Sequence, residues 1–131
     1  MSFKKSQKLY EKGLVNLVGA VNSPVRAFTS VGGNPLFIKR GRGSQIIDVD
    51  GNKYVDLVLS YGPMVLGHRH KKVQKAVHKA LKNGYSFGAS TESEITLAKI
   101  VCDAFPGMDK VRFVNSGTEA VISGKSLYRE R

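Results

Sequence analysis

The sequence predicts an α/β fold, in which a small antiparallel sheet is followed by the beginning of a larger domain with a parallel sheet. Asp50-Gly51-Asn52 separates two apolar, β-prone runs, which is the signal of an antiparallel hairpin. Residues 71–83 and 91–105 carry apolar side chains at helical spacing. Residues 111–114 predict a short strand that leads through a turn into a helix, as α/β domains begin. Because one parallel strand cannot form a sheet, we expect the sequence to stop just after it enters the larger domain.

Composition narrows the class of protein. The chain has 131 residues, 41% hydrophobic and 24% charged, with a net charge of +11. These values exclude wholesale disorder, a collagen-like repeat and a coiled coil. A lone Cys102 excludes a disulfide scaffold and a thiolate metal cluster, and it fits a reducing compartment. The polar N-terminus lacks the apolar core of a signal peptide, and no apolar run is long enough for a membrane span, so we expect a cytoplasmic protein.

Local patterns place each element in turn. The elements expected before residue 71 are a helix over 3–18 interrupted by Gly13, a loop over 22–34, strands over 36–39, 44–49 and 53–59, and a loop over 60–70. Residues 71–83 predict a helix whose apolar side chains lie on one face and which ends at Asn83-Gly84. The next helix opens with Thr91 and Glu94 in a capping box. Its expected buried stripe is Ile95, Leu97, Ala98, Val101, Cys102 and Phe105.

The turn after residue 114 is the sharpest chemical signal. The first N–H groups of a helix have no internal partner and attract anions. Ser116 and Thr118 add hydroxyl groups, and Gly117 lets a phosphate approach the backbone. The alternative interpretation is that Ser116 or Thr118 simply caps the helix.

Two loops carry further candidates. Pro24 makes the loop Asn22-Ser23-Pro24-Val25-Arg26 rigid, and a guanidinium held in this way suits a carboxylate. Tyr61 precedes Gly62-Pro63 and could wall a pocket. The structural alternatives are a surface arginine beside a turn and an ordinary loop. The three histidines lack the spacing of a ligand set, so no metal site is predicted.

Taken together, these motifs resemble the glutamate-1-semialdehyde 2,1-aminomutase family, which is related to the class III pyridoxal-phosphate-dependent aminotransferases of fold type I. The matching stretches are residues 21–28, 31–33, 48–52, 62–68, 86–89 and 111–120. The resemblance implies an isomerase that moves an amino group within glutamate-1-semialdehyde, which yields 5-aminolevulinate for tetrapyrrole synthesis. It also implies a homodimer and a cofactor that cycles between pyridoxal phosphate and pyridoxamine phosphate.

The resemblance assigns roles position by position. Ser116, Gly117 and Thr118 would hold the cofactor phosphate, and Ser23 and Arg26 the substrate carboxylate. Tyr61 stands where the family usually has tryptophan, which keeps an aromatic wall near the substrate.

The resemblance also implies missing parts. The lysine that forms the Schiff base has no counterpart here, so no catalytic residue is predicted. Residues 124–131 are more polar and basic than the family helix. We therefore expect a truncated, inactive fragment, with an N-terminal segment over 1–68 and the beginning of the cofactor-binding domain over 69–131.

Two alternatives remain at this stage. One is a fragment of another class III aminotransferase, although the loops at 22–26 and 62–68 favour the aminomutase. The other is a small basic nucleic-acid-binding protein, supported by the charge and by the basic helix over 69–82. We favour a solvated helix face as the explanation of that helix, and the chain has neither a zinc-finger spacing nor an aromatic RNA-binding signature, so no specific nucleic acid is expected.

Overall fold

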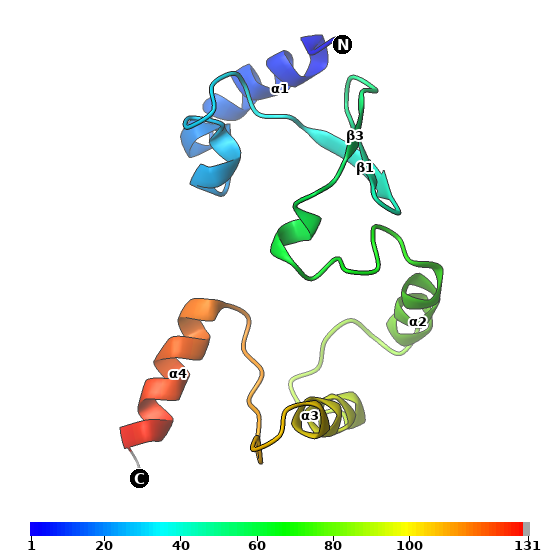
Figure 1. Cartoon of the computed structure of the whole chain (residues 1–131), viewed down its shortest axis with the longest axis vertical. Helices are drawn as coiled ribbons and strands as arrows, with labels where there is room; N and C mark the ends of the chain where they lie inside the picture. The colour runs from blue at the N-terminus through cyan, green and yellow to red at the C-terminus, as the bar shows by residue number, and fades with distance from the viewer. Residues whose placement is uncertain (130–131) are drawn as a thin grey trace. The chain divides into compact units, whose positions relative to one another are not determined.

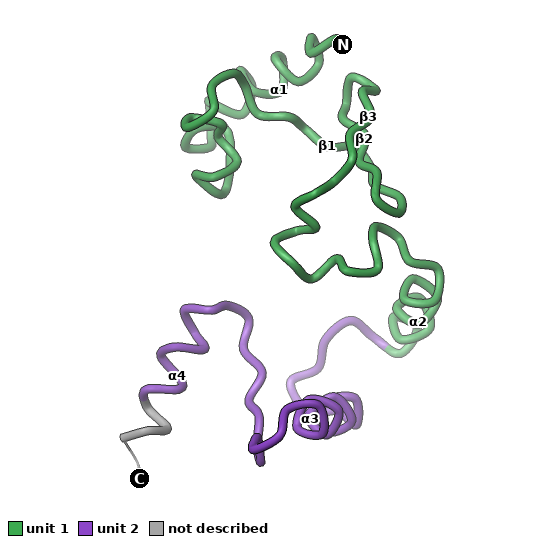
Figure 2. The backbone as a smooth tube through the Cα atoms, viewed as in Figure 1, with its two compact units in different colours: residues 1–83 green, residues 84–131 purple. Residues whose placement is uncertain are grey.

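The computed structural model describes the backbone of residues 1–129 and the side chains as far as residue 125. The chain divides into two compact units, Met1–Asn83 and Gly84–Arg131 (Figure 2). Helix α2 (Lys71–Leu81) therefore belongs to the first unit. The expected division into segments 1–68 and 69–131 stays a prediction.

A three-stranded antiparallel sheet organises the first unit (Figure 1). It consists of β1 (Ile38–Arg42), β2 (Gln45–Asp48) and β3 (Lys53–Val55), in that order across the sheet. The predicted antiparallel hairpin is confirmed, because β2 and β3 pair on either side of the Asp50-Gly51-Asn52 turn. The predicted strand over 36–39 begins later, at Ile38, and the strand over 53–59 ends at Val55.

A buried carboxylate holds the turn between β2 and β3. The side chain of Asp48 is 0% exposed. Its Oδ1 accepts the N–H groups of Asp50 at 2.9 Å and Asn52 at 2.8 Å. Its Oδ2 accepts the Asn52 side-chain amide and the Tyr54 hydroxyl, each at 2.8 Å. Burial acts to raise the pKa of Asp48, but these hydrogen bonds outweigh it, and the pKa lies below its ordinary value.

The same turn binds the first helix. Helix α1 (Lys4–Leu14) begins after Phe3, whose side chain cannot cap it. Asp50 supplies the missing cap: its Oδ1 accepts Lys5 N–H at 2.8 Å, and its Oδ2 accepts Ser6 N–H at 2.9 Å and the Ser6 hydroxyl at 2.8 Å. Asn52 adds a hydrogen bond from its side chain to the Ser2 carbonyl at 2.6 Å. A side chain more than forty residues away therefore satisfies the free N–H groups of the helix.

Gly13 has a packing role instead of the helix-interrupting role that the sequence suggested. It lies inside α1, and the helix ends one residue later, at Leu14, whereas residues 3–18 were expected to be helical. A Cβ on Gly13 would lie 2.9 Å from the Cβ of Ala20. Ala20 is the last residue of the short helix η1 (Val18–Ala20), and its side chain is buried. Glycine is needed here because it lets η1 approach α1 closely.

The next two helices, α2 and α3 (Glu92–Ala104), keep most of their apolar side chains exposed. The predicted capping box is present at α3, where Thr91 N–H donates to Glu94 Oε1 at 3.0 Å. The stripe expected to be buried on α3 is not: no residue of the helix is buried, Ile95 is 72% exposed, and Ala98, Val101 and Cys102 are only half-buried. Helix α2 also has no buried residue. Helical periodicity thus predicts which side of a helix is apolar but not what covers it.

The predicted strand over 111–114 is wrong for this chain. The segment carries no strand pairing within residues 1–129. A strand requires a hydrogen-bonded neighbour. The following helix is as predicted, since α4 spans Gly117–Arg129. Of the polar tail over 124–131, residues 130 and 131 lie outside the described residues. None of the described helices combines the length and apolarity needed to cross a membrane.

Replacing Asp50 by Ala should release α1 from the sheet. Lys5 and Ser6 lose their acceptor, so we expect their amide hydrogen exchange to accelerate by roughly tenfold or more. The exchange of Ile47 and Tyr54 in the sheet should change much less. Asp109→Ala is the matched control, because no hydrogen bond of the Asp109 side chain occurs within the described residues. Unchanged protection of Lys5 and Ser6 would contradict the capping role.

The cap that Asp50 places on α1 should weaken only when the pH falls below the ordinary range of an aspartate pKa. Burial acts to raise the pKa of Asp50, but the hydrogen bonds from Lys5 and Ser6 leave it below the ordinary value of 3.8. A carboxyl group with a lowered pKa stabilises the fold above its ordinary pKa, and this contribution is lost as the pH falls through the lowered value. We expect the Asp50 carboxyl carbon and the Lys5 and Ser6 amide protons to titrate together below 3.8 in NMR spectra. In Asp50→Asn these amide protons should not follow that titration.

Candidate functional site

The turn before α4 contains a helix cap. The Ser116 hydroxyl oxygen accepts the Glu119 N–H at 3.2 Å. The Glu119 side chain turns back, so that its Oε2 accepts Asn115 N–H at 2.7 Å and lies 3.4 Å from the Ser116 hydroxyl. The capping interpretation of Ser116 is therefore realised in the structure.

The cap leaves the anion-binding groups free. Within the described residues, the N–H groups of Gly117 and Thr118 have no acceptor. Nothing lies within 4 Å of the position that a Cβ on Gly117 would occupy. Two unpaired N–H groups at the positive end of a helix, beside the Thr118 hydroxyl, fit a phosphate. The Glu119 carboxylate lies at the same turn, so its charge opposes part of that attraction, while its hydrogen bonds keep the turn ordered.

The loop that carries Ser23 and Arg26 is a short helix. Helix η2 spans Pro24–Ala27, with Ser23 extended and Pro24 at the first helical position. Arg26 N–H donates to the Ser23 carbonyl at 2.9 Å, which ties the two candidates to one turn. The Arg26 side chain is exposed, and it forms no ion pair with the described acidic groups. Its guanidinium is thus available to a carboxylate.

Tyr61 lies on a strained turn. The short helix η3 (Leu59–Tyr61) has three consecutive residues with positive φ, of +51°, +53° and +63°. Left-handed backbone costs roughly 1–2 kcal/mol for each residue other than glycine, so the surrounding structure must impose it. The Tyr61 side chain is 66% exposed. Strained backbone clusters at functional sites, and the position of Tyr61 in a pocket wall stays a prediction.

The predicted residues fall into two groups. Ser23, Arg26 and Tyr61 belong to the first unit, whereas Ser116, Gly117 and Thr118 belong to the second. Within the described residues, no hydrogen bond joins Tyr61 to Ser23 or Arg26. The structure therefore brings together Ser23 with Arg26, and Ser116 with Gly117 and Thr118. The roles assigned to these residues stay predictions.

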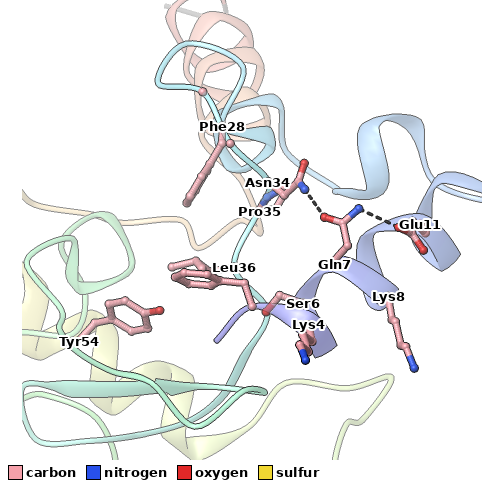
Figure 3. A pocket seen from close by; sticks show the side chains of 13 residues that line it. Lys4, Ser6, Gln7, Lys8, Glu11, Phe28, Asn34, Pro35, Leu36 and Tyr54 are labelled. Atoms are coloured by element: carbon pink, nitrogen blue, oxygen red, sulfur yellow. Dashed lines mark hydrogen bonds between the residues drawn. The ribbon is translucent and has the colours of Figure 1, made fainter. Parts of the chain in front are cut away.

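The sequence did not predict a cavity of about 920 Å³ in the first unit. Its wall combines α1 with the segment 28–36 and Tyr54, and Phe28, Leu36 and Tyr54 face it in Figure 3. At its polar edge, Asn34 donates a hydrogen bond to Gln7, and Gln7 donates to Glu11 at 2.8 Å. None of the six predicted site residues lines the cavity. The one hint in the sequence is Gly32-Gly33, whose positive φ angles let the segment turn toward α1.

Comparison with known proteins identifies a family. Residues 28–130 match the class III aminotransferase family. The chain is 58% identical over 129 residues to glutamate-1-semialdehyde 2,1-aminomutase of Thermodesulfovibrio yellowstonii, covering 98% of this chain and 30% of that protein. It is 53% identical over the same length to the enzyme of the same name from Syntrophomonas wolfei. The chain thus spans about 30% of the length of these curated relatives.

Solved structures share the fold. An omega-transaminase from Sphaerobacter thermophilus matches 90% of this chain and 26% of its own, with a TM-score of 0.81 and 35% identity. A beta-phenylalanine aminotransferase from Variovorax paradoxus matches 94% of this chain and 28% of its own, with a TM-score of 0.86 and 32% identity. A transaminase with pyridoxal phosphate bound matches 96% of this chain and 29% of its own, with a TM-score of 0.86 and 30% identity.

Replacing Ser116 by Ala tests the capping role of this side chain. The Glu119 N–H loses its acceptor, so the first turn of α4 should fray at a cost of about 1 kcal/mol. Amide exchange at Glu119 should accelerate, whereas Ser90→Ala, at an exposed serine, should leave it unchanged. Exchange at Glu119 equal to that of the unmodified chain would show that Ser116 does not cap the helix.

Proposed function

The chain belongs to the class III aminotransferase family, and we propose that it serves in a pyridoxal-phosphate-dependent glutamate-1-semialdehyde 2,1-aminomutase. The observation that carries this proposal is the identity of 53–58% to aminomutases over 98% of the chain. The covered stretch includes the turn at Ser116 and the loop at Ser23. The reaction is the transfer of an amino group within glutamate-1-semialdehyde, which gives 5-aminolevulinate for tetrapyrrole synthesis.

The cofactor phosphate is held at the beginning of α4. The free N–H groups of Gly117 and Thr118, together with the Thr118 hydroxyl, offer donors that a phosphate requires. The Ser116 hydroxyl adds a donor once it turns from Glu119 Oε2, which lies 3.4 Å away. The open space at Gly117 supports this role, because a phosphate needs close approach to the backbone. When bound, pyridoxal phosphate supplies an electron-withdrawing ring that stabilises negative charge at the substrate carbon.

The substrate carboxylate is held by the loop of the first unit. Arg26 offers a planar, permanently charged guanidinium that binds a carboxylate through two parallel hydrogen bonds. The Ser23 hydroxyl adds a third donor from the same turn, since its backbone already binds Arg26. Tyr61 provides an aromatic wall that excludes water from one side of the substrate, which strengthens the ionic interaction with Arg26.

Assembly and location follow from the same resemblance. We propose a homodimer in the cytoplasm, and the lone Cys102 agrees with a reducing compartment. The lysine that family enzymes attach to the cofactor has no counterpart among these 131 residues. The chain by itself is therefore expected to offer a phosphate site without turnover.

A second candidate is an aminotransferase that moves the amino group between two molecules. The similarity to the transaminases from Sphaerobacter thermophilus and Variovorax paradoxus favours it, although their identities of 35% and 32% are lower than those of the aminomutases. The two reactions differ in their need for a separate amino donor and acceptor.

A chimera tests the proposal directly. This chain replaces the matching 129 residues of the Thermodesulfovibrio yellowstonii relative, and 5-aminolevulinate is measured after addition of glutamate-1-semialdehyde. We expect formation of the product without an added amino donor. A requirement for a separate donor and acceptor would favour the aminotransferase. Loss of all conversion, with the relative itself active, would refute the aminomutase proposal.

In the same chimera, Arg26→Lys should weaken substrate binding. A lysine keeps the charge but loses the two-pronged geometry, so we expect KM for glutamate-1-semialdehyde to rise by roughly tenfold or more. Arg40→Lys on strand β1 is the matched control and should leave KM unchanged. An unchanged KM in Arg26→Lys would remove Arg26 from the proposed carboxylate site.

A further inference from the structure

The loop that presents Tyr61 is closed at its base by a carboxylate–imidazole pair. Asp56 Oδ2 lies 2.7 Å from His68 Nε2, although the two residues are twelve positions apart. Both side chains are shielded, with 9% of Asp56 and 19% of His68 exposed. The hydrogen bond with His68 is the main reason why the pKa of Asp56 lies below its ordinary value. Because an ionised carboxylate only accepts hydrogen bonds, His68 Nε2 donates.

The backbone fixes the same two residues to the sheet. Asp56 N–H donates to the Ser44 carbonyl at 2.8 Å. His68 and Gly43 exchange two backbone hydrogen bonds, at 2.8 and 2.9 Å. Both ends of the loop over 56–68 are therefore attached to the turn between β1 and β2, as in a compact Ω-loop.

Two glycines make room for this closure. A Cβ on Gly41 of strand β1 would lie 2.6 Å from His68 Cγ, so the imidazole packs directly on the strand backbone. A Cβ on Gly67 would lie 2.8 Å from the Gly43 carbonyl oxygen, and the φ of Gly67 is +73°. A larger residue at Gly41 would push the ring away from Asp56.

The Asp56 carboxylate also reaches the strained turn itself. Its Oδ1 accepts the N–H groups of Val58 at 2.9 Å and Leu59 at 3.1 Å. Leu59 is the first of the three left-handed residues, and Tyr61 is the last. The two oxygens of one side chain thus join the strained turn to His68 and, through His68, to the sheet.

We propose that Asp56 and His68 are positioning residues for Tyr61 and set the direction in which this aromatic wall meets the substrate. This inference rests on the proposed aminomutase function for the identity of the substrate, whereas the closure of the loop does not depend on it. Neither residue contacts the carboxylate site at Ser23 and Arg26 through a hydrogen bond within the described residues. Their effect passes through the backbone of residues 58–61.

The first test measures the loop without any reaction. In the full 131-residue chain, Asp56→Ala should accelerate amide exchange of Val58 and Leu59 by about tenfold or more. His68→Leu should accelerate it less, and His68→Gln, whose amide nitrogen can replace Nε2, should restore protection. Gly41→Ala should act like His68→Leu because it displaces the ring. His78→Gln on exposed helix α2 is the matched control.

The second test uses the chimera and separates positioning from simple loss of stability. Misplacement of Tyr61 should raise KM for glutamate-1-semialdehyde by about tenfold in His68→Leu, with a smaller change in kcat and rescue in His68→Gln. A purely structural role would lower the amount of active enzyme, and hence the apparent kcat, while KM stays unchanged. Unchanged exchange at Val58 and Leu59 in Asp56→Ala, or an unchanged KM in His68→Leu, would overturn the inference.

Two controls keep the outcomes distinct. If Asp56→Ala also accelerates exchange at Ile47 and Tyr54, the sheet itself has opened. In that case the comparison of His68→Leu, His68→Gln and Gly41→Ala decides whether the pair holds the Tyr61 turn. If the unmodified chimera forms no 5-aminolevulinate, the aminomutase proposal fails while the exchange data still decide whether the pair holds the Tyr61 turn.

Discussion

The cap that Asp50 places on helix α1 is the interaction on which the first unit depends. A helix begins with N–H groups that need acceptors, and Phe3 cannot provide one. Asp50 satisfies Lys5 and Ser6 from the turn between β2 and β3, and Asp48 orders that turn through four hydrogen bonds of its own. Ala20 and Pro35 are the buried apolar residues within residues 1–83. Directional polar contacts therefore hold this unit together where a large apolar core is missing.

The other end of the same sheet supports the loop over 56–68, which carries Tyr61 of the proposed substrate site. The turn between β1 and β2 accepts both ends of the loop over 56–68, and Asp56 extends that support to the left-handed turn at Tyr61. Each device uses a carboxylate with a lowered pKa, because hydrogen-bond donors converge on it. Hydrogen bonds at the two ends of the sheet therefore orient helix α1 and the turn at Tyr61.

The two proposed anion sites of this chain use different chemical groups. The turn at Gly117 offers backbone N–H groups and a helix dipole, which suit a phosphate that needs several donors at close range. The turn at Ser23 offers a guanidinium, which suits the flat geometry of a carboxylate. Ser116 caps its helix and leaves the next two N–H groups free, so capping and anion binding are compatible in one turn. A sequence pattern that could indicate either is here consistent with both.

Features that depend on neighbouring residues could be predicted from the sequence. The hairpin turn at Gly51, the capping box at Thr91 and the apolar face of α2 follow from local conformational preferences and spacing. The motifs around Ser23 and Ser116 were sufficient to indicate the family. The contacts of Asp50 with Ser6, of Gly13 with Ala20 and of Asp56 with His68 were decided only by the tertiary structure. Residues 111–114 show the same limit, since a pattern can favour an extended backbone, but a strand exists only where another strand supplies its hydrogen bonds.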